Sequence, residues 1–167
     1  MSDDPSRDWP ADSHHALGDA DVGVIGVVPD AGHKRLIDLC EADNAVRVVV
    51  FTGSGRAFCA GDDLKGYRGT KIGGTPLTAD IPPGHDSAIG TYDGLRTISQ
   101  QVNTAIRSLD KLTIAAINGV AIQTGFSLAL ACDFRIASKS ARMGSATLRF
   151  GLLPDEGGQY LLVQLLG

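Results

Sequence analysis

Two short apolar segments on either side of one amphipathic helix constrain the fold of this chain more than any other feature. Residues 46–52 form a nearly continuous apolar run, the pattern of a strand that is buried on both faces, and 112–117 predict a second buried strand. Between them, apolar side chains recur at helical spacing through 91–109. Strand, helix and strand predict a βαβ unit, and hence an α/β fold with a parallel sheet.

The segments after the second strand extend this pattern. Small apolar residues at 125–132 predict a buried helix, and 134–137 predict a third short strand. The run 160–166 is apolar and helix-like, so we expect it to dock on the core, to pack on a partner or to continue into further chain. Residues 66–90 are rich in Gly, Pro and Thr and predict a long surface loop.

The N-terminal end differs from the rest. Residues 1–21 are polar and acidic, and they lack the basic start and apolar run of a signal peptide. We expect a disordered acidic tail over 1–21 and an incomplete domain over 22–167. That domain begins with a short strand at 22–28 and a helix around 36–40.

Composition narrows the classes of partner. The net charge is -4 and 20% of the residues are charged, which gives no reason to expect nucleic acid or an anionic membrane. No apolar stretch approaches the roughly 20 residues that span a bilayer. Cys40, Cys59 and Cys132 are far apart and form no Cys/His cluster, so we expect no metal and reduced thiols. These features predict a cytoplasmic protein.

Two turns, 53–63 and 118–125, follow or neighbour the predicted strands. In an open α/β sheet, ligands bind where such turns cluster at the carboxyl ends of strands. The backbone N–H groups of Asp62 and Thr124 could point into one crevice, the second at the start of a helix. Two converging N–H donors suit a thioester carbonyl that is converted to an enolate.

Four segments resemble, in order, the signature motifs of the enoyl-CoA hydratase/isomerase (crotonase) family. They are 56–64 (RAFCAGDDL), 111–121 (KLTIAAINGVA), 131–137 (ACDFRIA) and 151–158 (GLLPDEGG). The resemblance implies a crotonase-like spiral core of ββα units with parallel sheets. It also implies that the family's C-terminal helical region is missing from this chain.

The same resemblance implies an acyl-CoA thioester as ligand, with the oxyanion hole formed by the N–H groups of Asp62 and Thr124. The second position is often glycine in the family, so Thr124 would adopt a backbone geometry that glycine takes more easily. The implied substrate-binding residues are Ala60, Gly61, Asp62, Leu64 and Gly125. No cofactor is expected beyond the coenzyme A carried by the substrate, and the full-length form is expected to be a homo-oligomer, a trimer or hexamer.

The acid/base residues depart from the family's hydratases, which use two glutamates. Those positions align with Ser127 and Thr147, neither of which can act as a carboxylate base, so two-glutamate hydration is disfavoured. Glu156 matches the "E-G-G" of some family isomerases. One carboxylate suffices to move a proton from C2 to C4 of an acyl chain, and we predict Glu156 as the catalytic base. Alternatively, Glu156 only precedes a helix, where acidic residues favour the dipole.

Enoyl-CoA isomerisation is therefore the predicted activity. One alternative is a catalytically inactive acyl-CoA-binding fragment, because the family's CoA-contacting segment is matched only by 29–31 and a substitute contact from Lys34 or Arg35 is not established. Another is an enoyl-CoA hydratase with non-standard acid/base residues. Asp63 and Asp133 are interpreted as structural acceptors that tie turns to backbone N–H groups.

Two rival classes also have sequence support. The glycines at 53–55 follow a strand, as in dinucleotide-binding domains, but the third glycine of that fingerprint is replaced by Phe58. The segment 125–129 (GFSLA) imitates the nucleophile elbow of serine hydrolases around Ser127, but every histidine precedes that serine.

Overall fold

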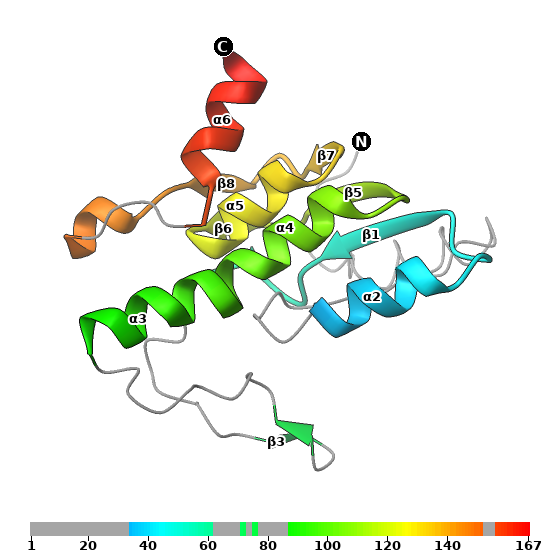
Figure 1. The fold of residues 1–167 in the computed structure, drawn as a ribbon. Helices are drawn as coiled ribbons and strands as arrows, with labels where there is room; N and C mark the ends of the chain where they lie inside the picture. Colours follow the sequence, from blue (N-terminus) through cyan, green and yellow to red (C-terminus); the bar gives the residue numbers. More distant parts are fainter. Residues whose placement is uncertain (1–33, 62–70, 73–74, 77–86, 152–155) are drawn as a thin grey trace.

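The computed structural model of the protein describes residues 34–61, 71–72, 75–76, 87–151 and 156–167. The predicted tail and the predicted strand at 22–28 lie outside these residues. In chain order the elements are α2 (Lys34–Ala42), β1 (Val48–Thr52), β2 (Ala57–Cys59), β3 (Lys71–Ile72), β4 (Thr75–Pro76), α3 (Ala88–Gly94), the π-helical turn η2 (Leu95–Ser99), α4 (Gln100–Ser108), β5 (Leu112–Ile117), β6 (Val120–Ile122), α5 (Thr124–Ala131), β7 (Phe134–Ala137), β8 (Arg142–Gly144), the 3-10 turn η3 (Thr147–Phe150) and α6 (Gly158–Leu166) (Figure 1).

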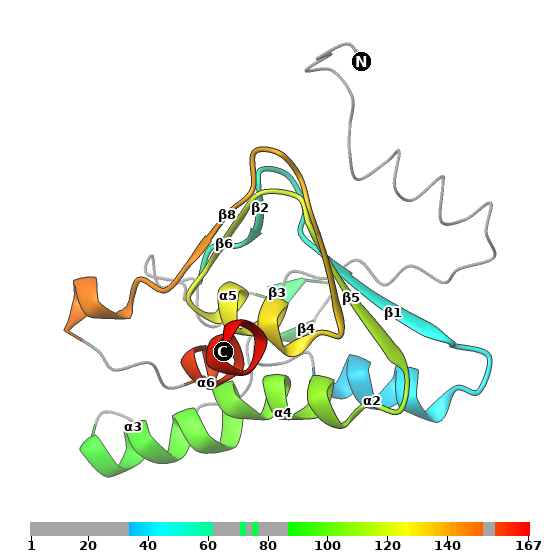
Figure 2. The same ribbon diagram turned by 90° about the horizontal axis from the view of Figure 1, so that it is seen from above.

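Six strands form two parallel sheets, in the orders β1-β5-β7 and β2-β6-β8. Each sheet takes one strand from each of three successive strand pairs, so the chain passes through both sheets three times. Figure 2 shows the sheets as two sides of a triangle, with α2 and α4 along the third side and α5 between them. The predicted α/β fold, a spiral of ββα units with parallel sheets, is confirmed.

The core lies between the β1-β5-β7 sheet and the helices. In β5, Thr113, Ala115 and Ile117 are buried and alternate with more exposed neighbours, as the two-residue period of a strand requires. In β1, three consecutive residues are buried, which confirms the prediction of a strand covered on both faces. Val102 and Ile106 of α4 lie one helical turn apart and pack into the same core.

Helix α5 is enclosed on nearly all sides, which explains its small and apolar composition. A Cβ atom on Gly125 would lie 2.5 Å from both Cβ and the carbonyl oxygen of Cys59, so only glycine permits this close approach to β2. At the other end, Arg135 Nη1 donates to the carbonyl oxygens of Cys132 (2.6 Å) and Ala129 (3.2 Å). A cation at this end of a helix also favours the helix dipole.

The sequence did not predict the second sheet. Strands β2, β6 and β8 have three residues each and fall within segments interpreted as turns or left unassigned. Strands this short carry no periodicity, and their pairing is set by the longer strands that precede them. The predicted helix over 91–109 begins earlier, at α3, and contains the π-helical turn η2. The predicted loop over 66–90 contains the β3–β4 hairpin and the first residues of α3.

Helix α6 corresponds to the apolar run at 160–166. Leu161 is buried against the core, which confirms the prediction of docking for one face of the helix. The other face is exposed at Tyr160, Val163 and Leu166. Figure 1 shows α6 rising away from the sheets, so its first turn is the part that meets the pocket described below.

Candidate active site

The two predicted ligand-binding turns meet in space. Gly61 has a φ of +90°, and a Cβ atom added there would lie 3.1 Å from Cβ of Gln123 and 3.4 Å from the carbonyl oxygen of Ile122. The end of the first turn therefore packs directly against the residue that precedes α5. Asn118 ties the turns together behind this contact, because its side chain accepts from the Gly53 N–H and donates to the Gly55 carbonyl oxygen.

Thr124 is the first residue of α5. Its N–H belongs to the first turn of the helix, where backbone donors have no partner within the helix and the dipole favours negative charge. The expectation that Thr124 adopts a glycine-like backbone is wrong, because the positive φ falls one residue earlier. Gln123 has φ 57° and ψ -117°, and it is the only non-glycine residue with positive φ in the described part of the chain.

The remaining residues of the predicted site divide into two groups. Ala60 is exposed and Gly61 is half-buried, both at the end of the first turn, whereas Gly125 is buried against Cys59. Asp62 and Leu64, together with the structural acceptor predicted at Asp63, lie outside the described residues. One of the two predicted oxyanion donors is thus placed at a helix N-terminus, and the other stays a prediction.

Glu156, from the C-terminal part of the chain, lies beside Thr124. It is 7% exposed, and its Oε1 accepts a hydrogen bond of 2.8 Å from the Thr124 hydroxyl. Its carbonyl oxygen accepts a hydrogen bond of 3.0 Å from Nδ2 of Asn103, a buried residue of α4. The chain around Glu156 is therefore fixed at its backbone and at its carboxylate. The carboxylate bonds to Thr124 of another helix, and its role as the catalytic base stays a prediction.

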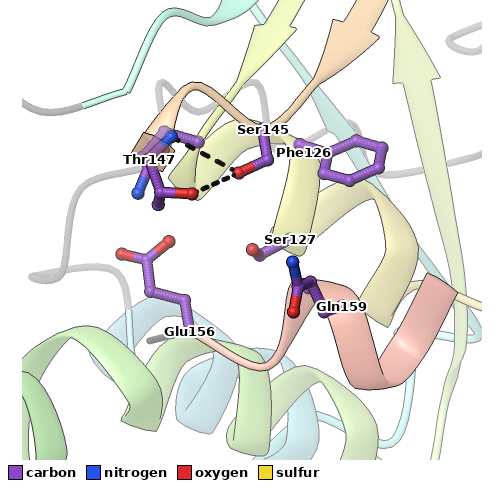
Figure 3. Close-up of a pocket in the computed structure, with 8 residues that line it drawn as sticks. Phe126, Ser127, Ser145, Thr147, Glu156 and Gln159 are labelled. Atoms are coloured by element: carbon purple, nitrogen blue, oxygen red, sulfur yellow. Dashed lines mark hydrogen bonds between the residues drawn. The ribbon is translucent and has the colours of Figure 1, made fainter. Parts of the chain in front are cut away.

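A pocket with an empty volume of about 250 Å³, part of it open to solvent, lies beside this carboxylate. Glu156 shares the pocket with Ser127 and Thr147, the two positions that align with the glutamates of family hydratases. Figure 3 shows the Glu156 carboxylate below Thr147, with Ser127 across the pocket. The described residues that line the pocket are Gln123, Phe126, Ser127, Ser145, Thr147, Glu156, Gly158 and Gln159. The structure thus brings a carboxylate from the "E-G-G" segment to the positions that lack one.

The sequence missed three polar residues of this pocket. Ser145 Oγ lies 2.8 Å from Thr147 Oγ1, so the two hydroxyls form one hydrogen-bonded pair on the wall. Gln159 and Gln123 also line the pocket. The sequence showed only that Gln123 lies between a predicted turn of small residues and a predicted helix. This position does not predict the direction of its side chain.

The structure argues against both rival classes. Ser127 is the fourth residue of α5, and an added Cβ on Gly158 would lie 2.5 Å from its Oγ, so it does not sit on the sharp strand-to-helix turn of a nucleophile elbow. The glycines at 53–55 are followed by strand β2, whereas the dinucleotide fingerprint requires a helix there.

The cysteines are placed as the composition suggested. All three are free and buried, and burial raises the pKa of the Cys132 thiol to about 12. Burial, followed by the nearby Asp43 carboxylate, also raises the pKa of Cys40. In the described part of the chain, no group of His, Cys, Asp and Glu side chains could hold a metal ion. Nor does any helix there have the length and apolar character that crossing a membrane requires.

Comparison with known proteins agrees with the fold. The family model "Enoyl-CoA hydratase/isomerase" matches residues 34–167. The chain is 35% identical to "Probable enoyl-CoA hydratase 1, peroxisomal" of Arabidopsis thaliana, over 79% of this chain and 44% of that protein. It is also 35% identical to the 1,2-epoxyphenylacetyl-CoA isomerase of Escherichia coli K12, over 83% of this chain and 49% of that protein.

Solved structures show the same relationship. Pseudomonas aeruginosa DspI aligns with a TM-score of 0.67 and 30% identity, covering 86% of this chain and 53% of that one. A Thermobifida fusca YX protein of the enoyl-CoA hydratase type, in complex with CoA, aligns with a TM-score of 0.65 and 31% identity, covering 87% and 57%. The fold and the pocket define a crotonase-type protein. The chain belongs to the enoyl-CoA hydratase/isomerase family, and it spans about half the length of the curated relatives it matches.

Proposed function

We propose that this protein binds an acyl-CoA thioester and isomerises its acyl chain by moving a proton with Glu156. The observation that carries the proposal is the hydrogen bond between the Glu156 carboxylate and Thr124, the residue whose N–H is the proposed oxyanion donor. A base and an oxyanion donor must lie on neighbouring parts of one substrate, because the proton leaves the carbon next to the thioester carbonyl.

In the proposed reaction, Glu156 removes a proton from C2 of a 3-enoyl thioester. The C2–H electron pair moves into the C1–C2 bond and the charge collects on the thioester oxygen. The backbone N–H groups of Thr124 and Asp62 stabilise that oxygen. The protonated Glu156 then returns its proton to C4, so that the double bond moves from C3–C4 to C2–C3. One carboxyl group begins and ends the cycle ionised, and no other reactant is consumed.

The role of Thr124 in this proposal is double. Its backbone faces the developing charge, and its hydroxyl fixes one carboxylate oxygen of the base at 2.8 Å. Such positioning of an acid/base group accounts for a large part of its rate contribution, since small misplacements lower the rate steeply.

The test is conversion of 3-enoyl-CoA to 2-enoyl-CoA by the wild-type chain and by Glu156→Gln. Loss of a general base typically lowers the rate by about 10²–10⁴-fold, and we expect kcat to fall in that range. The matched control is Asp133→Asn, the same chemical change at a carboxylate that also bonds to a threonine but does not line the pocket. We expect kcat of this control to change less than about threefold.

Equal rates for the wild type and Glu156→Gln would refute the assignment of Glu156. CoA-thioester binding without turnover would favour the inactive acyl-CoA-binding fragment. Hydration of 2-enoyl-CoA without isomerisation would favour a hydratase with non-standard acid/base residues. Assembly into a homo-oligomer and a cytoplasmic location stay predictions, which gel filtration and cell fractionation would test.

A further inference from the structure

Gln123 holds a backbone conformation that its side chain disfavours. Its φ of 57° and ψ of -117° lie outside the regions that L-residues occupy without strain. Holding a residue in such a region costs stability, and glycine would avoid most of that cost. Strain of this kind at the wall of a pocket is a reason to ask what the side chain does.

The surrounding structure fixes this conformation without using the amide group. The Gln123 N–H donates to the Gly144 carbonyl oxygen at 3.2 Å, and the Gln123 carbonyl oxygen accepts from the Ser127 N–H at 3.0 Å. The Cβ atom packs against Gly61. A glycine at this position would make both backbone hydrogen bonds and would lose only the Cβ contact. The fold therefore does not explain why a glutamine stands here.

The amide group itself faces an unusual environment. Gln123 lines the pocket beside Glu156, and its Oε1 is buried with no hydrogen-bond partner among the described residues. A buried acceptor without a partner lowers stability, because it has lost its hydrogen bonds to water. A bound group that carries an O–H or N–H would remove that cost, and a purely hydrocarbon group would not.

We propose that Gln123 is a specificity-determining residue that hydrogen-bonds to a hydroxyl group on the acyl chain, close to the reacting carbons. This inference rests on acyl-CoA binding as proposed above. The position follows from the chain, because Gln123 directly precedes Thr124, the residue that faces the thioester oxygen. A hydroxyl both donates and accepts, so it pairs with the amide in either orientation of its oxygen and nitrogen.

The rest of the pocket agrees with a polar acyl group. Ser127, Ser145 and Thr147 line it, and Phe126 is the only large apolar residue among the described residues that do so. A pocket for a plain hydrocarbon chain is lined predominantly by apolar side chains. The same O–H chemistry could come from a bound water molecule, and the experiment must separate the two sources.

The experiment measures dissociation constants by titration calorimetry for butanoyl-CoA and for its 2-hydroxy, 3-hydroxy and 4-hydroxy derivatives. Butanoyl-CoA lacks the double bond that isomerisation moves, so its binding is measured without turnover. We expect the wild type to bind at least one hydroxylated thioester about tenfold more tightly than butanoyl-CoA. Gln123→Gly should lose this preference, because it removes the amide and keeps the backbone conformation. Gln159→Ala, which removes the other pocket amide, should retain it.

The folding control is the melting temperature, which we expect to rise in Gln123→Gly because the strain is relieved. Two results would overturn the inference: equal affinity of the wild type for all four thioesters, or an unchanged hydroxyl preference in Gln123→Gly. If Gln123→Gly bound all four thioesters more weakly by the same factor, the amide would be assigned to binding a water molecule, and the inference would be overturned as well. These outcomes leave the proposed function standing, whereas no binding of any acyl-CoA would contradict both.

Discussion

The molecule contains the same chemical pair twice, a carboxylate that accepts a hydrogen bond from a threonine hydroxyl. At the sheet, Asp133 Oδ2 accepts from Thr113 Oγ1 at 2.7 Å and from its N–H at 2.8 Å, and the Asp133 N–H donates back to the Thr113 hydroxyl. At the pocket, Glu156 accepts from Thr124.

The two pairs differ in what surrounds them. Asp133 is exposed to solvent and takes part in a closed ring of hydrogen bonds that joins β5 to the start of β7, which confirms its interpretation as a structural acceptor. Glu156 is buried, yet its carboxylate borders empty space. A carboxylate whose hydrogen bonds come from the chain itself stabilises the fold. A buried carboxylate beside a pocket can interact with a ligand.

The largest effect on stability is expected from Thr113→Val at the structural pair. Thr113 is 1% exposed, and the change deletes the hydroxyl that both donates to Asp133 and accepts from it. Removing a buried hydrogen-bonding partner costs about 1–3 kcal/mol, or roughly 2–9 °C in melting temperature for a chain of this size. Urea unfolding measures the loss. A free energy of unfolding within about 0.5 kcal/mol of the wild type would mean that water replaces the ring.

Thr124→Val makes the same change at the pocket pair and should separate the two roles. It keeps the shape and the backbone N–H but removes the hydroxyl that orients Glu156. We expect kcat for isomerisation to fall about tenfold, equivalent to about 1.4 kcal/mol, with KM nearly unchanged. The melting temperature should also fall, because the buried Glu156 carboxylate loses a hydrogen-bond donor. Thr124→Ser, which restores a hydroxyl, should recover most of the rate. Failure of serine to rescue would assign the effect to packing.

The two pairs also show which parts of the structure could be predicted from the sequence. The long elements were predictable, because β1 and β5 are nearly continuous apolar runs and α4 carries the 3.6-residue period of a helix with one buried face. The pairing of Asp133 with Thr113 had a recognisable basis in a short acceptor at a turn. The contact between Thr124 and Glu156 had none, since 32 residues separate them and only the spiral brings them together.

The backbone conformation of Gln123 could not be predicted from the sequence either. Helix α5 was predicted within one residue at each end, yet the glycine-like backbone was assigned to Thr124 instead of Gln123. Propensity cannot reveal such a position, because glutamine rarely adopts a positive φ and does so here only through contacts with Gly144, Ser127 and Gly61. The short second sheet escaped prediction for the same reason, since its pairing comes from tertiary structure.

The smallest predicted effect concerns pH and Asp133. Hydrogen bonds from the Thr113 hydroxyl and then its N–H lower the pKa of the Asp133 carboxyl, with smaller contributions from Arg107 and Arg135. Because the folded pKa is lowered, the ionised carboxylate stabilises the fold above the unfolded pKa of about 3.9, and this stabilisation is lost as the pH falls through the folded value. Solvent screens an exposed group, so we expect less than about 1 kcal/mol.

Asp133→Asn isolates this contribution, because it keeps the shape of the side chain and removes its titration. The difference in free energy of unfolding between wild type and variant should be constant from about pH 5 to 8 and should narrow below about pH 4. Urea unfolding at stepped pH measures it, with Glu156→Gln as the parallel variant at the other carboxylate. A difference that widens on acidification would mean that the ring with Thr113 favours the protonated acid. In that case Asp133 would no longer be the ionised structural counterpart with which Glu156 is compared.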